Sequence, residues 1–208
     1  MTGIEYFYSA HSSFTYLGSA RFLEIARAAG REVVHRPVHL DRVVEAAGSK
    51  PFRERTRAFR AYFFEREMER WAEEREVALM TTWSRHHYVD MTLANCMLIA
   101  CAQRGLDTDR LSHAVLAAHW VDDADPSDPA GLTRIAASVD VDAGPLLADA
   151  ASKSVRAEYE ANTEEAIQRS VFGAPTYFVD GDMFYGQDRL ELLERSLRLP
   201  YRQVRITV

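Results

Sequence analysis

Two hydroxyl side chains, Ser12 and Ser13, stand where a short apolar stretch, residues 4–8, gives way to an amphipathic one. The pattern predicts a buried strand followed by a helix that begins near these serines. The N-terminus of a helix favours negative charge, and a serine hydroxyl there can donate a hydrogen bond to a thiolate and lower its pKa. Because serine is also a preferred N-cap residue, the pattern fits either a thiolate-binding hydroxyl or a simple helix cap.

A second candidate site is the stretch Phe172-Gly173-Ala174-Pro175-Thr176, which precedes the best hairpin signal in the chain. Proline is tolerated at the first residue of a strand. If the Ala174-Pro175 bond is cis, the backbone groups of Ala174 face the Ser9–Ser13 turn and could pair with a peptide-like ligand. The alternative is an ordinary trans proline that only begins a strand.

The elements that must position these residues are predicted in three blocks. Residues 1–45 form a βαβ unit, residues 46–169 are helical, and residues 170–208 form a ββα unit. Each strand-bearing end is too small to bury a sheet alone, so we expect the two ends to pair. The result is an α/β chain with a discontinuous thioredoxin-like domain (βαβ + ββα) that carries a large all-helical insertion.

Three spaced motifs carry a family resemblance. Ser12-Ser13-Phe14-Thr15-Tyr16-Leu17 resembles the Ser-Pro-Phe-Ser-Tyr-Leu signature of the 2-hydroxychromene-2-carboxylate isomerases and their kappa-class glutathione transferase relatives, within the DsbA-like thioredoxin superfamily. The stretches 172–176 and 186–190 resemble two further signatures in the same order, and Arg70-Trp71-Ala72 also fits. The similarity spans essentially the whole chain.

The resemblance implies a glutathione cofactor and the residues that hold it. Ser12 would hydrogen-bond the glutathione sulfur and keep it as thiolate, and Ala174, before a cis Pro175, would pair with the cysteinyl backbone. Gln187 and Asp188 would hold the γ-glutamyl end, where a carboxylate facing an ammonium group makes a charge-assisted contact. Relatives also suggest a homodimer.

The implied reaction interconverts a chromene carboxylate and a trans-o-hydroxybenzylidenepyruvate through addition and elimination of the glutathione thiolate. The substrate is a small aromatic carboxylate, which Lys50 and Arg53 near the start of a long charged helix could receive. The alternative for these basic residues is a solvated helix face. Two other functions stay open: a kappa-class-like glutathione transferase and a non-catalytic thioredoxin-fold binding module.

The chain departs from the family pattern at three places. Ser13 replaces the usual proline, which makes it a rival to Ser12 for the thiol contact, and Ser49-Lys50 stands where relatives tend to have an asparagine. His11 stands where relatives usually carry an apolar residue. A cationic His11 could stabilise the thiolate or bind substrate, and an exposed turn histidine without a role is the alternative.

Composition narrows the other partners. The net charge of −6 and pI near 5.7 give no electrostatic reason to bind nucleic acid or a membrane surface. No secretory leader and no apolar run of bilayer length is visible, so we expect a cytoplasmic protein.

Cys96 and Cys101 are read as buried reduced thiols, and thiol-disulfide exchange is close to excluded because Ser12 and Thr15 occupy the positions of the required cysteines. His86 and His87 have no completing ligands, so no metal is expected.

Overall fold

The computed structural model describes residues 3–202 and contains one four-stranded sheet in the order β2-β1-β3-β4. β1 (Ile4–Tyr8) pairs in parallel with β2 (Val33–Pro37), and antiparallel with β3 (Thr176–Val179). β4 (Asp182–Tyr185) completes a hairpin with β3, closed by the Asp180-Gly181 turn. The predicted pairing of the two ends of the chain is confirmed, because β1 from the first unit lies beside β3 from the last.

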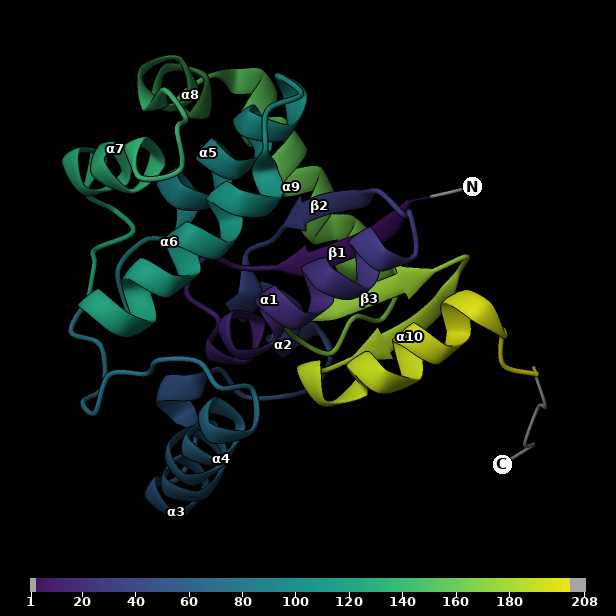
Figure 1. Cartoon of the computed structure of the whole chain (residues 1–208). Coiled ribbons are helices and arrows are strands. Elements are labelled where there is room, and N and C mark those ends of the chain that lie inside the picture. The colour runs from purple at the N-terminus through teal and green to yellow at the C-terminus, as the bar shows by residue number, and fades with distance from the viewer. Residues whose placement is uncertain (1–2, 203–208) are drawn as a thin grey trace.

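Both faces of the sheet are covered. On one face, α1 (Ser13–Ala28) and α10 (Leu190–Arg198) lie across the strands, as Figure 1 shows. On the other face, α2 (Leu40–Ala46) and α9 (Lys153–Gln168) enclose a smaller apolar cluster with Phe7 and Phe178. Strand side chains alternate between the faces, so Tyr6 and Tyr8 enter the main core while Phe7 enters the smaller one.

The stretch between α2 and α9 is helical and contains no strand; all of it lies within the described residues. Four helices, α5 (Thr92–Gln103), α6 (Thr108–Asp122), α7 (Pro129–Ala137) and α8 (Ala143–Ala150), form a cluster beside the sheet (Figure 1). α5 is buried along most of its length and joins the main core with the strands. These helices therefore share the core of the sheet.

A separate arm holds residues 51–75, the long charged helix expected within the predicted helical block. It consists of a 3-10 turn (Phe52–Glu54), α3 (Arg57–Phe59), a π-helix (Arg60–Arg66) and α4 (Glu67–Glu74). Met68 and Ala72 of α4 pack against Tyr16 and Leu17 of α1, which attaches the arm to the body. Helix was correctly predicted here, whereas the extended break at Arg55 and Thr56 was not.

Two local predictions are confirmed: the Ala174-Pro175 bond is cis, and Cys96 and Cys101 are free and buried. Asp128 caps α7 ahead of Pro129 at its first turn. Within residues 3–202, no helix is long and apolar enough to cross a membrane.

Candidate functional site

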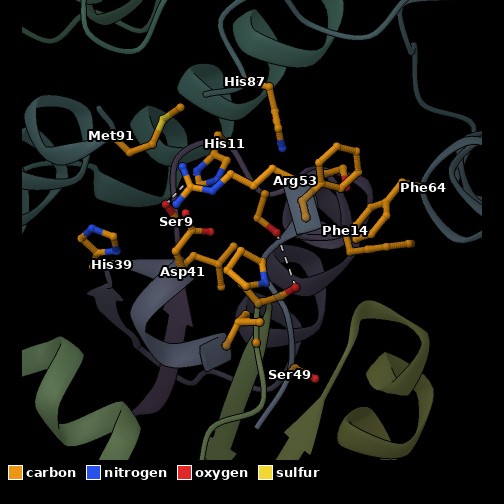
Figure 2. A pocket seen from close by; sticks show the side chains of 18 of the residues that line it. Ser9, His11, Phe14, His39, Asp41, Ser49, Arg53, Phe64, His87 and Met91 are labelled. Atoms are coloured by element: carbon orange, nitrogen blue, oxygen red, sulfur yellow. Dashed lines mark hydrogen bonds between the residues drawn. The ribbon is translucent and has the colours of Figure 1, made fainter. Parts of the chain in front are cut away.

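The turn between β1 and α1 forms the floor of a cavity of about 620 Å³, shown in Figure 2. The turn lies where β1 ends, and β1 runs through the centre of the sheet, so its position is fixed by strand pairing on both sides. Ser9, His11, Ser12 and Ser13 all line the cavity from this turn, and Gly173 and Ala174 line it from the loop before β3. The two segments singled out in the sequence therefore meet at one site.

Ser12 is both the helix cap and a cavity-lining hydroxyl. Its Oγ accepts a hydrogen bond from the Thr15 amide at 3.3 Å and donates to the Ala174 carbonyl at 3.4 Å. The second bond is long for a hydroxyl donor, so the Ser12 proton is available to a stronger acceptor. Ser12 can therefore be the helix cap and still offer its hydroxyl proton to a bound thiolate, so the two interpretations left open by the sequence are compatible.

The first turn of α1 adds a favourable field for an anion. This helix has 16 residues and no acidic residue in its first turn. Its free first-turn amides and its dipole favour a negative group next to Ser12 and Ser13. Ser13, the rival for the thiol contact, also lines the cavity and is 5 % exposed.

The turn is held from beneath by Asn95, which the sequence analysis missed. This side chain is fully buried in α5; its Oδ1 accepts from the Ala10 amide at 2.9 Å, and its Nδ2 donates to Ser9 Oγ at 3.2 Å. On the outer side, the Trp120 indole donates to the His11 carbonyl at 3.0 Å. An asparagine within the apolar run of residues 93–101 was the available signal, since a buried amide requires partners.

His11 lines the cavity beside Ser12, and its Nδ1 is hydrogen-bonded to Ser9 Oγ at 3.0 Å (Figure 2). Burial, together with the nearby His119 and His39, lowers the pKa of His11 to about 3. The lowered pKa argues against a cationic His11: desolvation penalises the charged imidazole, which favours the neutral form at pH 7. The side chain is half-buried rather than exposed, and its role stays a prediction.

His87 enters the cavity opposite the floor, as Figure 2 shows, and the sequence analysis had set it aside after considering only metals. Its ring lies 5.1 Å from that of His11 and 5.3 Å from that of Phe52. Burial first, then His11 and His119, lower the pKa of His87 to about 2. Among residues 3–202 no group of three or more His, Cys, Asp or Glu side chains could hold a metal ion.

One wall of the cavity is aromatic and another is basic. Phe52 stacks on Trp83 with ring centroids 4.4 Å apart and planes at 6°, which makes that wall rigid. Lys50, Arg53 and Arg55 also line the cavity, and Figure 2 shows Arg53 extending into it. Arg57, the next basic residue, does not line it. The aromatic lining residues come from separate segments of the chain: Phe14, Phe52, Phe59, Phe63, Phe64, Tyr88, Tyr159, Phe172 and Tyr185.

Three predicted cofactor residues, Pro175, Gln187 and Asp188, lie outside the lining. Gln187 is 1 % exposed; its Oε1 accepts from Arg75 Nε at 3.2 Å, and its Nε2 is buried without a partner among the described residues. Asp188 is exposed and forms an ion pair with Arg189 at 2.5 Å. Asp188 still lies close enough to Tyr185 at the cavity wall to contribute to its raised pKa, which is due mainly to burial.

Comparison with known proteins identifies the family. The model of the DSBA-like thioredoxin domain matches residues 3–198. A 2-hydroxychromene-2-carboxylate isomerase from Sphingobium xenophagum is 31% identical over 197 residues, which cover 93% of this chain and 97% of that protein. An isomerase of the same name from Pseudomonas sp. (strain C18) is 25% identical, over 93% of this chain and 89% of its own.

Solved structures give the same fold. A 2-hydroxychromene-2-carboxylate isomerase structure superposes with a TM-score of 0.78 at 23% identity and covers 94% of each chain. A probable DsbA oxidoreductase from Streptomyces coelicolor superposes with a TM-score of 0.73 at 19% identity, over 100% of this chain and 94% of that one. The thioredoxin-like fold with added helices is therefore confirmed, and the named relatives support an enzyme of the isomerase class. The chain belongs to the DSBA-like thioredoxin-domain family and, within it, to the relatives of the 2-hydroxychromene-2-carboxylate isomerases.

Proposed function

We propose that the chain is a glutathione-dependent isomerase of aromatic carboxylates that interconverts a chromene carboxylate and its ring-opened trans-o-hydroxybenzylidenepyruvate. The observation that carries the proposal is the Ser12 hydroxyl at the N-terminus of α1, in the floor of a cavity with aromatic and basic walls. A hydroxyl at a helix N-terminus suits a thiolate, and the two walls suit a ring and a carboxylate.

The residues present fit glutathione. Ala174 offers a carbonyl whose bond to Ser12 is long, and its amide makes no hydrogen bond within residues 3–202, so both backbone groups suit an extended peptide. The cavity of about 620 Å³ is within the size range of sites for small molecules. Gln187 and Asp188 remain our candidates for the γ-glutamyl end on the family resemblance, and both lie beyond the residues that line the cavity.

Bound glutathione would supply a thiolate that adds reversibly to the conjugated double bond of the substrate and so permits rotation about it. The protein's part is to position and to stabilise charge. Ser12 donates its hydroxyl proton as a hydrogen bond to the sulfur, and the α1 dipole favours the anion. Lys50 and Arg53 bind the substrate carboxylate, and the Phe52 and Phe64 rings cover its aromatic part and exclude water.

Two comparisons support this proposal. The relatives named above bear the name of the isomerase in question, and they align along nearly the whole chain. A cytosolic disulfide reductase from Pseudomonas aeruginosa with the same fold, at a TM-score of 0.67 and 16% identity over 95% of this chain and all of its own, has been solved with GSH. Disulfide reduction needs reactive cysteines, whereas Cys96 and Cys101 are buried in α5 away from the cavity lining. Isomerisation therefore suits this chain better than thiol-disulfide exchange.

The experiment is a calorimetric titration with glutathione between pH 6 and 9, followed in parallel by thiolate absorbance near 240 nm. Saturable binding with a thiolate signal at pH 7 is expected, followed by isomerisation of a chromene carboxylate. Ser12→Ala should weaken the thiolate by about 1.5 to 3 kcal/mol, the contribution of a hydrogen bond to a charged group, and so raise the pKa of the bound thiol by about one to two units.

Ser13→Ala is the matched control, since Ser13 is the neighbouring cavity hydroxyl. If Ser13→Ala removes the thiolate signal and Ser12→Ala does not, the residue assignment is wrong. Thiolate binding with conjugation of electrophiles and no isomerisation would identify a kappa-class-like transferase. No binding at millimolar glutathione would refute the proposal and favour a binding module. A homodimer in the cytoplasm remains our prediction.

A further inference from the structure

The His11 side chain lies on the cavity floor, and the proposed function gives it no task. His11 directly precedes Ser12 in the sequence, and its side chain lines the same cavity. Nδ1 is engaged with Ser9, whereas Nε2 makes no hydrogen bond within residues 3–202 and is not among the buried unpartnered atoms. Nε2 is therefore open to whatever occupies the cavity.

The hydrogen bonds beneath the turn determine which ring nitrogen carries the proton. The Ala10 amide can only donate, so the Asn95 atom that it meets is the carbonyl oxygen, and the Asn95 amide group faces Ser9. Ser9 Oγ therefore accepts from Asn95. Ser9 is 1 % exposed, and its hydroxyl proton has one remaining partner among the described residues, His11 Nδ1.

A neutral imidazole whose Nδ1 accepts carries its proton on Nε2. If Nδ1 carried the proton instead, Ser9 Oγ would accept two hydrogen bonds and its own buried proton would have no acceptor, which is costly. The hydrogen bonds from Asn95 to Ser9 and from Ser9 to His11 thus fix the His11 tautomer, just as a hydrogen bond to the second ring nitrogen fixes the tautomer of a metal-binding histidine. The result is an N–H donor aimed at the cavity beside Ser12.

We propose that His11 is a catalytic residue that, as the neutral Nε2–H tautomer, donates a hydrogen bond to the oxygen of a conjugated 2-oxo acid where negative charge gathers during isomerisation. The inference rests on the proposed isomerase function. The thiolate that bound glutathione would supply would form a C–S bond at one carbon of the double bond to be rotated, and the π pair would move toward the conjugated carbonyl oxygen. When the C–S bond breaks, the pair returns, the double bond re-forms and the thiolate is released unchanged. His11 keeps its proton throughout and acts only as a hydrogen-bond donor.

The surroundings favour a neutral donor over a cation. Three histidines surround His11: the His87 ring, from the loop before α5, lies 5.1 Å away, and His119 of α6 and His39 before α2 act on it electrostatically. Asp41 and Arg53 line the same cavity from α2 and the arm. Burial keeps the His11 ring uncharged. A neutral ring can donate a hydrogen bond to an oxygen that gains negative charge, and it does not repel the cationic Arg53 of the same cavity.

Three variants at one position test the donor. His11→Phe keeps a ring but removes Nε2, and it should lower kcat about 10²- to 10³-fold, as loss of one preplaced donor to a developing oxyanion does, with little change in KM. His11→Gln places an amide near Nε2 and should keep kcat within about tenfold of the wild type. His11→Asn reaches only to the Nδ1 position and should behave like the Phe variant.

A measurement without substrate tests the tautomer. Long-range ¹H–¹⁵N spectra of the histidine rings, assigned by comparison with His11→Phe, should show one ring with bare Nδ1 and protonated Nε2 that does not titrate between pH 5 and 8. In Ser9→Ala this ring should shift toward a mixture of tautomers. A proton on Nδ1, or a doubly protonated ring at pH 7, would overturn the inference.

The proposed function and this inference can fail separately. Glutathione binding that persists in His11→Phe together with unchanged kcat would refute the role of His11 and leave the isomerase proposal standing. Absence of glutathione binding by the wild type would refute both. Equal activity of the Gln and Asn variants would also contradict a donor located at Nε2.

Discussion

Replacing Asn95 with Ala should weaken the whole protein and its candidate site together. Asn95 and Ala10 are both fully buried, and the Ala10 amide donates to Asn95 Oδ1 at 2.9 Å. Truncation leaves this amide without an acceptor, at a cost of about 1 to 3 kcal/mol. It also removes the donor to Ser9 Oγ and leaves a small void, so the total loss in free energy of unfolding should be about 2 to 4 kcal/mol.

Urea unfolding followed by circular dichroism measures this loss, and a calorimetric scan should show the melting temperature falling by about 5 to 15 °C for a chain of this length. Gln103→Ala, at the exposed end of the same helix, is the control and should change stability by less than about 0.5 kcal/mol. If Asn95→Ala costs less than about 1 kcal/mol, the turn is not held from beneath as argued. Glutathione affinity should fall with stability, since Ser12 belongs to the same turn.

Two further predictions concern packing and protonation. A methyl group added at Gly18 of α1 would lie 2.5 Å from Cβ of Gln187. Gly18→Ala should therefore lower the free energy of unfolding, measured in urea, by about 1 to 3 kcal/mol. A neutral effect would show that Gln187 does not pack against α1. In the folded protein the pKa of His11 is lowered to about 3 and that of His87 to about 2, both below the value of about 6.5 in the unfolded chain. Below pH 6.5 the unfolded chain therefore binds more protons than the folded one. The free energy of unfolding should fall as the pH drops from 6.5 toward 3. Replacing His87 with Phe should flatten this dependence in unfolding titrations, and an unchanged slope would argue against a buried neutral His87.

Much of the fold followed from local patterns. The apolar residues 4–8, the Asp180-Gly181 turn and the cap at Asp128 act through short-range sterics and hydrogen bonds, so each could be assigned from its neighbours in the sequence. The extended break at Arg55 and the π-helix that follows it could not be assigned from the sequence, because a charged amphipathic stretch is equally compatible with one continuous helix.

The site was predicted less completely. Ser12 and Ala174 could be paired because strand order brings their loops to one edge of the sheet, and that geometry is confirmed by the 3.4 Å contact between them. His87 and Asn95 were missed because their importance arises from what they meet. Neither residue lies near the turn in sequence, and a single histidine or amide carries no periodic signal.

The sequence by itself determined the elements, the βαβ and ββα units and the serine at the start of α1, since these depend on periodicity, capping and turn chemistry. Only the tertiary structure decided the protonation state of His11 and the identity of the groups around Ser12. Hydration loss and hydrogen-bond partners set the charge of a side chain, and here they depend on residues distant in the chain, such as Asn95 acting through Ser9, and His119.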